Sequence, residues 1–403
     1  MNRVALKKPA IEGGKPVRKR FLIFGQPRLF REEIDEIIDT VRSGWWGTGP
    51  KTHEFERRFA HYSQAKYALA LNSATAGLHL ALDVLGVGPG DEVITTPLTF
   101  VSTANVIVHR GAIPVFADID PDTWNIDPAE IEKRINKKTK MIIPVHLHGR
   151  PCDMGAILTI TRKHKLKVIE DAAHATEAWY RKKKIGSMAD FTAFSFYATK
   201  NLATGEGGML TTNNKSYALE ARIKSLHGIS HDAWKRYSAA GFTPYDAVYA
   251  GYKYNMPDLM ASLGLHQLKR LQANWQIRKR YWQRLDKGLS DIAGITLPPK
   301  SLPDTTPAYH LYAILIEPQR IKISRNQFID ALKFEGIGAG VHFDPVHLHS
   351  FYRKTFGFKP DDFPHAEAVG STTLSLPFYP HMTEKDVDDV IEAVRKLCKY
   401  YSR

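Results

Sequence analysis

The sequence Val168-Ile-Glu-Asp171 ends an apolar run, and the sequence Phe194-Ser-Phe-Tyr-Ala-Thr-Lys-Asn201 follows it along the chain. Both runs have the composition of buried strands. The glycine-rich segment Thr204-Gly-Glu-Gly-Gly-Met209 closes the stretch. These residues place a carboxylate at the end of one strand, a hydroxyl in a second strand and a lysine shortly after it.

Three side chains of this stretch have the chemistry that pyridoxal phosphate (PLP) requires. The aldehyde of PLP needs an amine for a Schiff base, its ring nitrogen needs an anion, and its phosphate needs hydrogen-bond donors. We predict these roles for Lys200, Asp171 and Ser195, respectively. Each residue alone has an ordinary alternative: a solvated loop lysine, a turn-forming aspartate and a serine bonded to its own backbone. The prediction therefore rests on their combination.

The length and composition limit the classes of protein to consider. A chain of 403 residues can form one large domain and a smaller one. No apolar run reaches the roughly 20 residues that span a bilayer, and the basic N-terminus lacks the apolar core of a secretory signal. Two cysteines, Cys152 and Cys398, cannot form a disulfide framework or a metal site. We therefore expect a cytoplasmic protein without a metal centre or membrane insertion.

The net charge of +14 raises the question of nucleic-acid binding. The basic residues are dispersed, and we find neither zinc-finger spacing nor a basic motif interleaved with aromatic residues. The densest run, Arg181–Lys184, is predicted to be a solvated hairpin turn, and Arg278–Arg280 is predicted to be an exposed helix face. We do not expect nucleic-acid binding, and a basic surface would also attract an anionic small molecule such as a nucleotide diphosphate.

Strands and helices alternate through the first half of the chain, which predicts a parallel sheet covered by helices on both faces. Sites in such sheets lie at the carboxyl ends of the strands, where Asp171 and the turn Ser73–Thr75 fall. Backbone N–H groups at this turn are suited to phosphate, and ordinary N-capping by Ser73 is the alternative. We predict strands at Tyr67–Leu71, Glu92–Thr96, Ala112–Ile119, Met141–Leu147 and Leu166–Glu170, with helices at Ser102–Arg110, Pro128–Ile135 and Met154–His164.

The pattern changes after a predicted strand that ends at Thr212, and it indicates a second, smaller domain. We expect a loosely held N-terminal arm (1–20), a large domain (21–256), a linking helix (257–289) and a small C-terminal α/β domain (290–403). The elements predicted outside the alternating region are helices at 31–42, Ala218–Leu226, Arg325–Glu335 and Glu384–Tyr400, strands at Tyr312–Ile316 and near Gly340–Phe343, and a loop-like segment at 227–256.

Ordered motifs along the chain carry a resemblance to a known family. They are Gly-Thr-Gly-Pro at 47–50, Asn-Ser-Ala-Thr-Ala-Gly at 72–77, Gly-Asp-Glu-Val-Ile at 90–94, Pro-Val-His-Leu-His-Gly at 144–149, Glu-Asp-Ala-Ala-His-Ala at 170–175, the segment 194–201, Gly-Tyr-Lys-Tyr-Asn at 251–255 and Leu-Ser-Leu-Pro at 374–377. The chain resembles the DegT-type nucleotide-sugar aminotransferases, and within them most of all the UDP-4-amino-4-deoxy-L-arabinose aminotransferases. The resemblance implies the PLP-dependent aminotransferase fold type I: a large domain with a mixed, mostly parallel sheet flanked by helices, plus a smaller C-terminal α/β domain.

The resemblance also implies roles for individual residues. Lys200 would form the Schiff base with PLP, Asp171 would pair with its ring nitrogen, and Phe100 would stack on the ring. His174 stands near the ring oxygen, where many members have Gln. Ser195 and the backbone of Ala74 and Thr75 would hold the phosphate, and Lys253 stands where many members have an Asn that reaches the partner subunit's phosphate, with Asn255 as its less favoured substitute. A homodimer with shared active sites follows from this role.

The expected reaction moves an amino group from an amino acid, L-glutamate by expectation, to a 4-keto nucleotide sugar. His310, His342 and His347 are candidates for substrate contact, and for each an ordinary buried or solvated histidine is the alternative. A second hypothesis is a PLP-dependent sugar dehydratase of the same family, although those enzymes carry His in place of Lys200. A third is a PLP-binding regulatory or scaffold protein without turnover.

Overall fold

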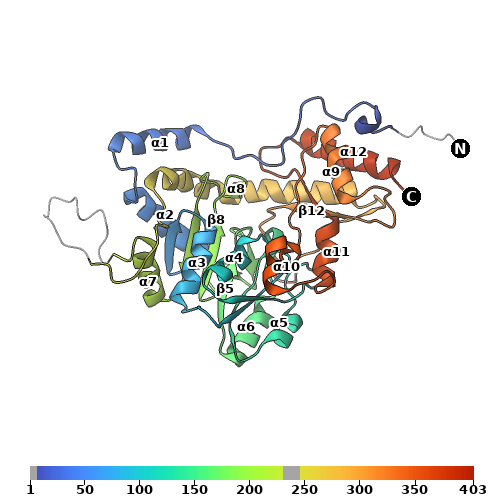
Figure 1. The fold of residues 1–403 in the computed structure, drawn as a ribbon. Helices are drawn as coiled ribbons and strands as arrows, with labels where there is room; N and C mark the ends of the chain where they lie inside the picture. The colour runs from blue at the N-terminus through green and yellow to red at the C-terminus, as the bar shows by residue number, and fades with distance from the viewer. Residues whose placement is uncertain (1–6, 230–245) are drawn as a thin grey trace.

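A seven-stranded sheet forms the centre of the molecule in the computed structural model, which describes residues 7–229 and 246–403 (Figure 1). Only β9 runs antiparallel to its neighbours in this sheet, so the prediction of a mixed, mostly parallel sheet is confirmed. The strand order is β1 (Tyr67–Leu71), β9 (Gly208–Thr212), β8 (Phe191–Ser195), β5 (Lys167–Asp171), β4 (Thr139–Ile143), β2 (Glu92–Thr95) and β3 (Ile113–Phe116).

Helices cover both faces of this sheet, which explains why the residues of β8 and β9 are all buried. Phe55 and Phe59 are fully buried in the core. One face packs against α3 (Ala74–Val84), α4 (Ser102–His109) and α7 (Lys215–Ser225). The other packs against α2 (Pro50–Ser63), α5 (Pro128–Arg134), α6 (Met154–His164) and the first half of α8 (Asp258–Leu289).

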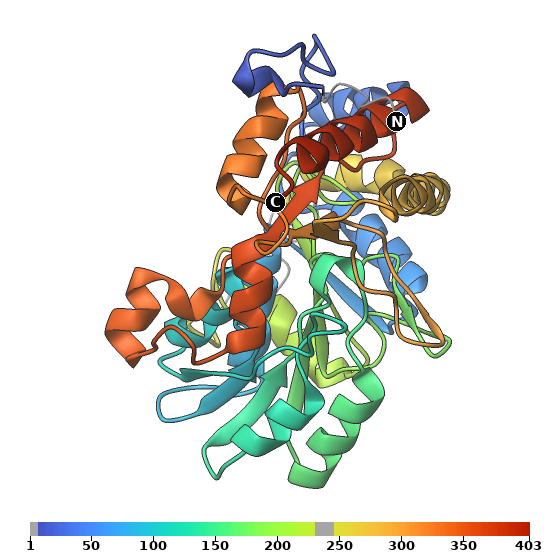
Figure 2. The ribbon, with the colours of Figure 1, turned by 90° about the vertical axis from the view of Figure 1, so that its right-hand side faces the viewer.

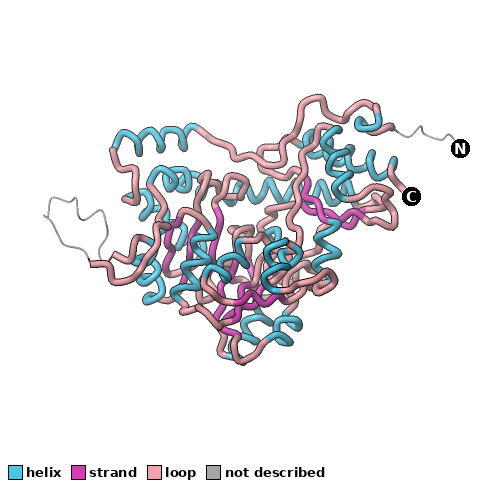
Figure 3. The backbone as a smooth tube through the Cα atoms, in the orientation of Figure 1, coloured by secondary structure: helices cyan, strands magenta, loops and turns pink. Residues whose placement is uncertain are grey.

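A second core lies at the C-terminal end of α8, in the upper part of Figure 2. The long helix contributes Leu265 and Leu271 to the first core and Tyr281 and Leu285 to the second, so it connects the two. An antiparallel sheet of β10 (Ile295–Thr296), β12 (Tyr312–Ile316) and β13 (Thr373–Leu376) packs there against α9 (Arg325–Phe334) and α12 (Glu384–Tyr400), while α10 (Ser350–Phe356) and α11 (Pro364–Thr372) lie beside the large sheet. Figure 3 shows the two groups of strands apart.

The N-terminal arm is held in place over the part that the structure describes, contrary to the expectation of a loose segment. The N–H groups of Ala10 and Val17 donate to the buried carboxylate of Glu335 at 2.8 and 2.9 Å. Arg18 forms ion pairs with Asp386 and Asp389 of α12. The arm therefore packs against the second core before the chain reaches α1 (Arg31–Ser43).

Two basic runs are less exposed than their composition predicts. Lys184 is buried in a small sheet of β11 (Thr305–Thr306), β6 (Trp179–Tyr180) and β7 (Lys183–Lys184), and its Nζ donates to the carbonyl of Glu177 at 3.0 Å. Arg278 is buried on α8 and donates to three backbone carbonyls. Both predictions of an exposed run are therefore wrong at these positions: backbone carbonyls surround Arg278, and the carbonyl of Glu177 and the ring of Tyr62 contact Lys184.

The predicted strand near Gly340–Phe343 is also wrong. Only Gly340 pairs with a neighbouring strand, exchanging two hydrogen bonds with Ser375 at 3.0 and 2.8 Å. His342 and Phe343 then leave the sheet and line a cavity instead. Part of the predicted loop-like segment, 230–245, lies outside the described residues.

Candidate active site

A cavity of about 310 Å³ lies at the carboxyl edge of the large sheet. The ends of β5 and β8 and the start of α3 meet there, because β1, β5 and β8 point the same way. Eight residues to which the sequence assigned a role border it: Ala74, Thr75, Phe100, Asp171, His174, Ser195, Lys200 and His342. Ser73, from the turn that the sequence places at this edge, borders it too. So do residues to which the sequence assigned no role, namely Thr99, Ser102, Val145, Ala173, Tyr197, Thr199, Glu206, Gly207 and Phe343.

The first turn of α3 offers backbone donors to this cavity. Ser73 caps the helix by accepting a hydrogen bond from the N–H of Ala76 at 3.0 Å, so the N-capping interpretation holds as well. The N–H groups of Ala74 and Thr75 have no acceptor within the helix, and the Ser195 side chain borders the same space. Gly208 allows the close approach of β9, since a Cβ there would lie 2.5 Å from the nitrogen of Ala74.

Asp171 is a buried carboxylate held by two hydrogen bonds. Its oxygens accept from Thr103 Oγ1 at 2.8 Å and from the N–H of Ala173 at 3.1 Å. Burial raises the pKa of Asp171, while these hydrogen bonds and the charge of Lys200 act in the opposite direction. A cationic ring nitrogen beside this carboxylate would compensate for the loss of solvation.

Lys200 borders the cavity from the turn after β8, where its N–H donates to the carbonyl of Tyr197 at 2.8 Å. Burial lowers the pKa of Lys200 to about 8, although the negative charge of Asp171 raises it. A larger fraction of this amine is therefore neutral near pH 7 than in an ordinary lysine. Lys200 also borders a second cavity of about 110 Å³, between residues 24–30, α8 and residues 378–381.

His174 is a neutral hydrogen-bond donor at the cavity. Burial lowers its pKa well below the ordinary value, and its Nδ1 accepts a hydrogen bond from the backbone N–H of His148 at 3.3 Å. The proton of the neutral ring is therefore on Nε2. His174 can therefore donate a hydrogen bond through Nε2. His148 supports the ring of His174 through this hydrogen bond. The sequence reasoning assigned His148 no role, and the signal that could have found it is its position in the His146-Leu-His-Gly149 motif after β4.

The other candidate histidines occupy three different positions. His342 borders the cavity and contacts Ser375 Oγ at 2.9 Å. His310 is buried behind His174, with ring centroids 4.5 Å apart, and borders only the smaller cavity. The structure does not bring His347 to either cavity: it is buried against Phe363 and bonded to Glu367 at 2.9 Å. The ordinary alternative of a buried, bonded histidine describes His347.

Lys253 lies beside the start of α3 with an exposed side chain. Its carbonyl accepts from Asn72 Nδ2 at 3.2 Å, and the residue does not border this cavity. Asn255, the less favoured substitute, donates to Thr48 Oγ1 at 2.6 Å instead. Phe100 is 56% exposed at the cavity, 5.8 Å from the ring of Phe343, so an aromatic face is available there.

The residues of this cavity fit PLP. Free first-turn amides and hydroxyls suit a phosphate, a buried carboxylate suits a protonated ring nitrogen, and a lysine of lowered pKa suits an aldehyde. Among residues 7–229 and 246–403, no group of three or more His, Cys, Asp or Glu side chains is placed to hold a metal ion. In the same residues, no helix combines the length and the hydropathy that crossing a membrane requires.

Comparisons with known proteins agree with this site. Residues 27–395 match the model of the DegT/DnrJ/EryC1/StrS aminotransferase family. The spore coat polysaccharide biosynthesis protein SpsC of Bacillus subtilis is 51% identical over 95% of this chain and 98% of its own length.

Solved structures show the same fold. Spr1654 of Streptococcus pneumoniae, known in PLP and PMP forms, superposes in its PMP form with a TM-score of 0.89 at 37% identity, covering 94% of this chain and 100% of its own. PseC of Helicobacter pylori, an aminotransferase of pseudoaminic acid biosynthesis, superposes with a TM-score of 0.88 at 28% identity, covering 95% and 100%. The chain belongs to the DegT/DnrJ/EryC1/StrS aminotransferase family and is a PLP-dependent aminotransferase.

Proposed function

We propose that this aminotransferase moves an amino group from L-glutamate to a 4-keto nucleotide sugar and releases a 4-amino sugar nucleotide. The observation that supports the proposal most directly is that Lys200, Asp171 and the free amides of α3 border one cavity. The relatives support a sugar substrate, since SpsC is a polysaccharide biosynthesis protein and PseC acts in the biosynthesis of pseudoaminic acid. A role in cell-surface polysaccharide biosynthesis follows.

PLP, when bound, supplies an electron sink for negative charge on the carbon that carries the amino group. The chain's own residues do the rest. The amides of Ala74 and Thr75 and the hydroxyl of Ser195 bind the phosphate, and Asp171 keeps the ring nitrogen protonated. Lys200, as a free amine, would take the Cα proton of glutamate and pass it to the carbon two atoms away, across the intervening nitrogen. In the second half of the reaction, the same residues act on the keto sugar, and their steps occur in the reverse order.

We further propose that the active unit is a homodimer whose sites are shared. Lys253 is exposed near Asn72, just before α3, and does not border the cavity of its own chain; this exposure supports a role for Lys253 at the phosphate of a second copy. One face of α1 also exposes Ile34, Ile38 and Val41, and a second copy would cover it. A cytoplasmic location, also proposed, suits two buried free cysteines.

The test is direct. The protein loaded with PLP is mixed with glutamate and, separately, with a panel of 4-keto nucleotide sugars including the UDP-linked pentose, and the products are identified by mass. We expect the visible absorption of the cofactor to bleach with glutamate and one sugar to gain an amino group. Lys200→Ala is the control. Loss of the 3-hydroxyl from a sugar without amination would instead support the dehydratase, and a cofactor indifferent to both reactants would support binding alone.

A further inference from the structure

Asn201, the residue after Lys200, is buried and makes four hydrogen bonds. Its Nδ2 donates to both carboxylate oxygens of Glu177 at 2.9 Å and to the carbonyl of Ala308 at 3.0 Å. Its Oδ1 contacts Nδ1 of His310 at 2.9 Å. Carbonyl and carboxylate oxygens can only accept, so the amide nitrogen must face them and the amide oxygen must face His310. The proton of this contact is therefore on Nδ1 of His310.

This contact leaves a lone pair on the other ring nitrogen of His310. Burial and the charges of Lys200 and Arg278 lower the pKa of His310 well below its ordinary value, so the ring is neutral. A neutral imidazole with its proton on Nδ1 is an acceptor at Nε2, and the hydrogen bond of the His310 ring within the described residues is the one at Nδ1. His310 and Lys200 border the same cavity of about 110 Å³.

The neighbouring ring of His174, tilted by 38° against that of His310, has the opposite polarity. His174 lies 4.5 Å from His310 between ring centroids, and the N–H of His148 makes it a donor at Nε2. Two adjacent neutral imidazoles thus offer a donor from one ring and an acceptor from the other. Lys200 borders the cavities of both rings.

We propose that Asn201 is a positioning residue that fixes the tautomer of His310, so that Nε2 of His310 accepts a hydrogen bond from the free amine of Lys200. The proposal rests on the aminotransfer proposed above. His310 takes no proton in this scheme. It orients the neutral amine before the amine removes the substrate proton, and it accepts one of the N–H groups of the ammonium that results, until the proton is passed on.

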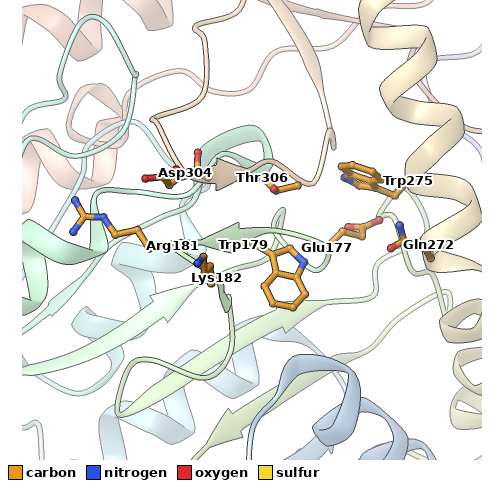
Figure 4. Close-up of a pocket in the computed structure, with 9 residues that line it drawn as sticks. Glu177, Trp179, Arg181, Lys182, Gln272, Trp275, Asp304 and Thr306 are labelled. Atoms are coloured by element: carbon orange, nitrogen blue, oxygen red, sulfur yellow. The ribbon is translucent and has the colours of Figure 1, made fainter.

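A variant at Asn201 is feasible because of the surroundings of Glu177, which accepts hydrogen bonds from the Asn201 amide. Glu177 forms part of the wall of an open groove of about 840 Å³, together with Trp179, Gln272 and Trp275 (Figure 4). Water in this groove can solvate the carboxylate when the amide is removed. Asn201→Ser keeps a hydroxyl donor near Glu177, and the positive charges of Arg278 and Lys184 still act on the carboxylate, so we expect the variant to fold.

The tautomer is measured on the folded chain without cofactor. Nitrogen-15 labelling of the histidines and long-range nitrogen–proton correlation spectra at pH 7.5 distinguish a protonated from an unprotonated ring nitrogen, and His310→Gln assigns the signal. We expect Nδ1–H in the natural chain and a mixture with Nε2–H in Asn201→Ser. The matched control is Asn274→Ser, which borders the same small cavity and should leave the tautomer unchanged.

The kinetic consequence is measured on the half-reaction with glutamate. Asn201→Ser should lower the maximal rate roughly 10- to 100-fold, with the bound PLP and the KM for glutamate unchanged within about twofold. An Nε2–H tautomer in the natural chain would overturn the proposal without any variant. So would a changed tautomer with an unchanged rate. Failure to aminate any nucleotide sugar would contradict the proposed function but leave both measurements valid.

Discussion

Lys200 performs the central step of the proposed reaction, and burial lowers the pKa of its amine to about 8. Replacing it by alanine removes the only group assigned to proton transfer. We expect Lys200→Ala to retain PLP through the phosphate contacts but to lose at least roughly 1,000-fold in kcat, as is typical when a central catalytic group is deleted. Absorbance spectra and single turnovers measure both effects. Lys183→Ala, on the exposed hairpin, is the control, and undiminished turnover would remove Lys200 from the mechanism.

Asp171 permits a graded test, because its charge and its hydrogen bonds can be removed separately. Asp171→Asn keeps the shape but removes the anion, and we expect a loss of roughly 100-fold or more in kcat. Thr103→Val removes only one hydrogen bond to the carboxylate, so the expected loss is smaller. The rates with saturating glutamate decide the order. Near-normal turnover in Asp171→Asn would contradict the assignment of this residue.

Four histidines near Lys200, namely His148, His174, His310 and His342, also make stability depend on pH. Burial lowers the pKa of each, that of His342 to about 4. The unfolded chain, with ordinary values near 6.5, therefore binds more protons as the pH falls through 6.5 toward the folded values. The free energy of unfolding must then fall on acidification, by at most about 1.4 kcal/mol per pH unit for each histidine.

Urea denaturation at pH 7.5 and pH 5.5 checks this expectation, since other groups also titrate in this range. His310→Gln removes one titrating ring, so its stability should fall less than that of the natural chain between the two pH values. An equal or larger fall in His310→Gln would show that the buried ring does not contribute. The comparison of the two slopes isolates this histidine from all other groups.

At the scale of elements, Asp258 at the start of α8 holds the start of α2 in place through hydrogen bonds. Its buried carboxylate accepts from the N–H groups of Gly49, Lys51 and Thr52 and from the hydroxyl of Thr52, at 2.6 to 3.0 Å. Because α2 has no side-chain cap of its own, these amides depend on a residue some 200 positions away. The contact fixes the two helices relative to each other beside the loop 47–50.

We expect Asp258→Ala to lower the free energy of unfolding by roughly 3 kcal/mol, since buried amides lose a charged partner. Equilibrium urea denaturation measures the change. Asp291→Ala is the matched control: this aspartate forms an exposed ion pair with Arg395, and exposed pairs contribute little. A change at Asp258 no larger than that at Asp291 would contradict the fastening role.

At the scale of the whole molecule, α1 directs its polar face toward the protein and its apolar face toward solvent, which is the reverse of an ordinary surface helix. Glu33 and Glu36 face α8, where they bond to Gln267 and His266. The apolar residues Ile34, Ile38 and Val41 remain exposed, at 43, 40 and 46%. A helix whose polar side is inward and whose apolar side faces solvent is typical of an interface between subunits.

We expect Ile38→Asp to weaken association of the proposed homodimer at least roughly tenfold, because a charge replaces a buried apolar contact. Activity should fall with dilution if Lys253 completes the neighbour's site. Sedimentation velocity and activity across a dilution series measure both. Phe334→Asp, at an exposed apolar residue on α9, is the control. A monomer of full activity would rule out shared sites.

Local patterns in the sequence determined most of the elements. The bounds of α6, β12 and α12 agree with the predicted ones, because helix and strand periodicity and the Thr383–Asp386 cap are properties of adjacent residues. The chemistry of Lys200, Asp171 and Ser195 could also be read from their segment, since parallel strands end at one edge of a sheet. The structure brings all three to one cavity.

Only the tertiary structure decided which polar groups are buried and which apolar groups stay exposed. Arg278 and Lys184 look like solvated cations until carbonyls and aromatic rings from distant segments surround them. The ring contact of His174 with His310, the separation of His347 and the outward face of α1 depend in the same way on contacts between residues far apart in the chain. The periodicity of the sequence indicates that a side chain packs against another part of the protein. Which part that is depends on how the helices and strands pack together.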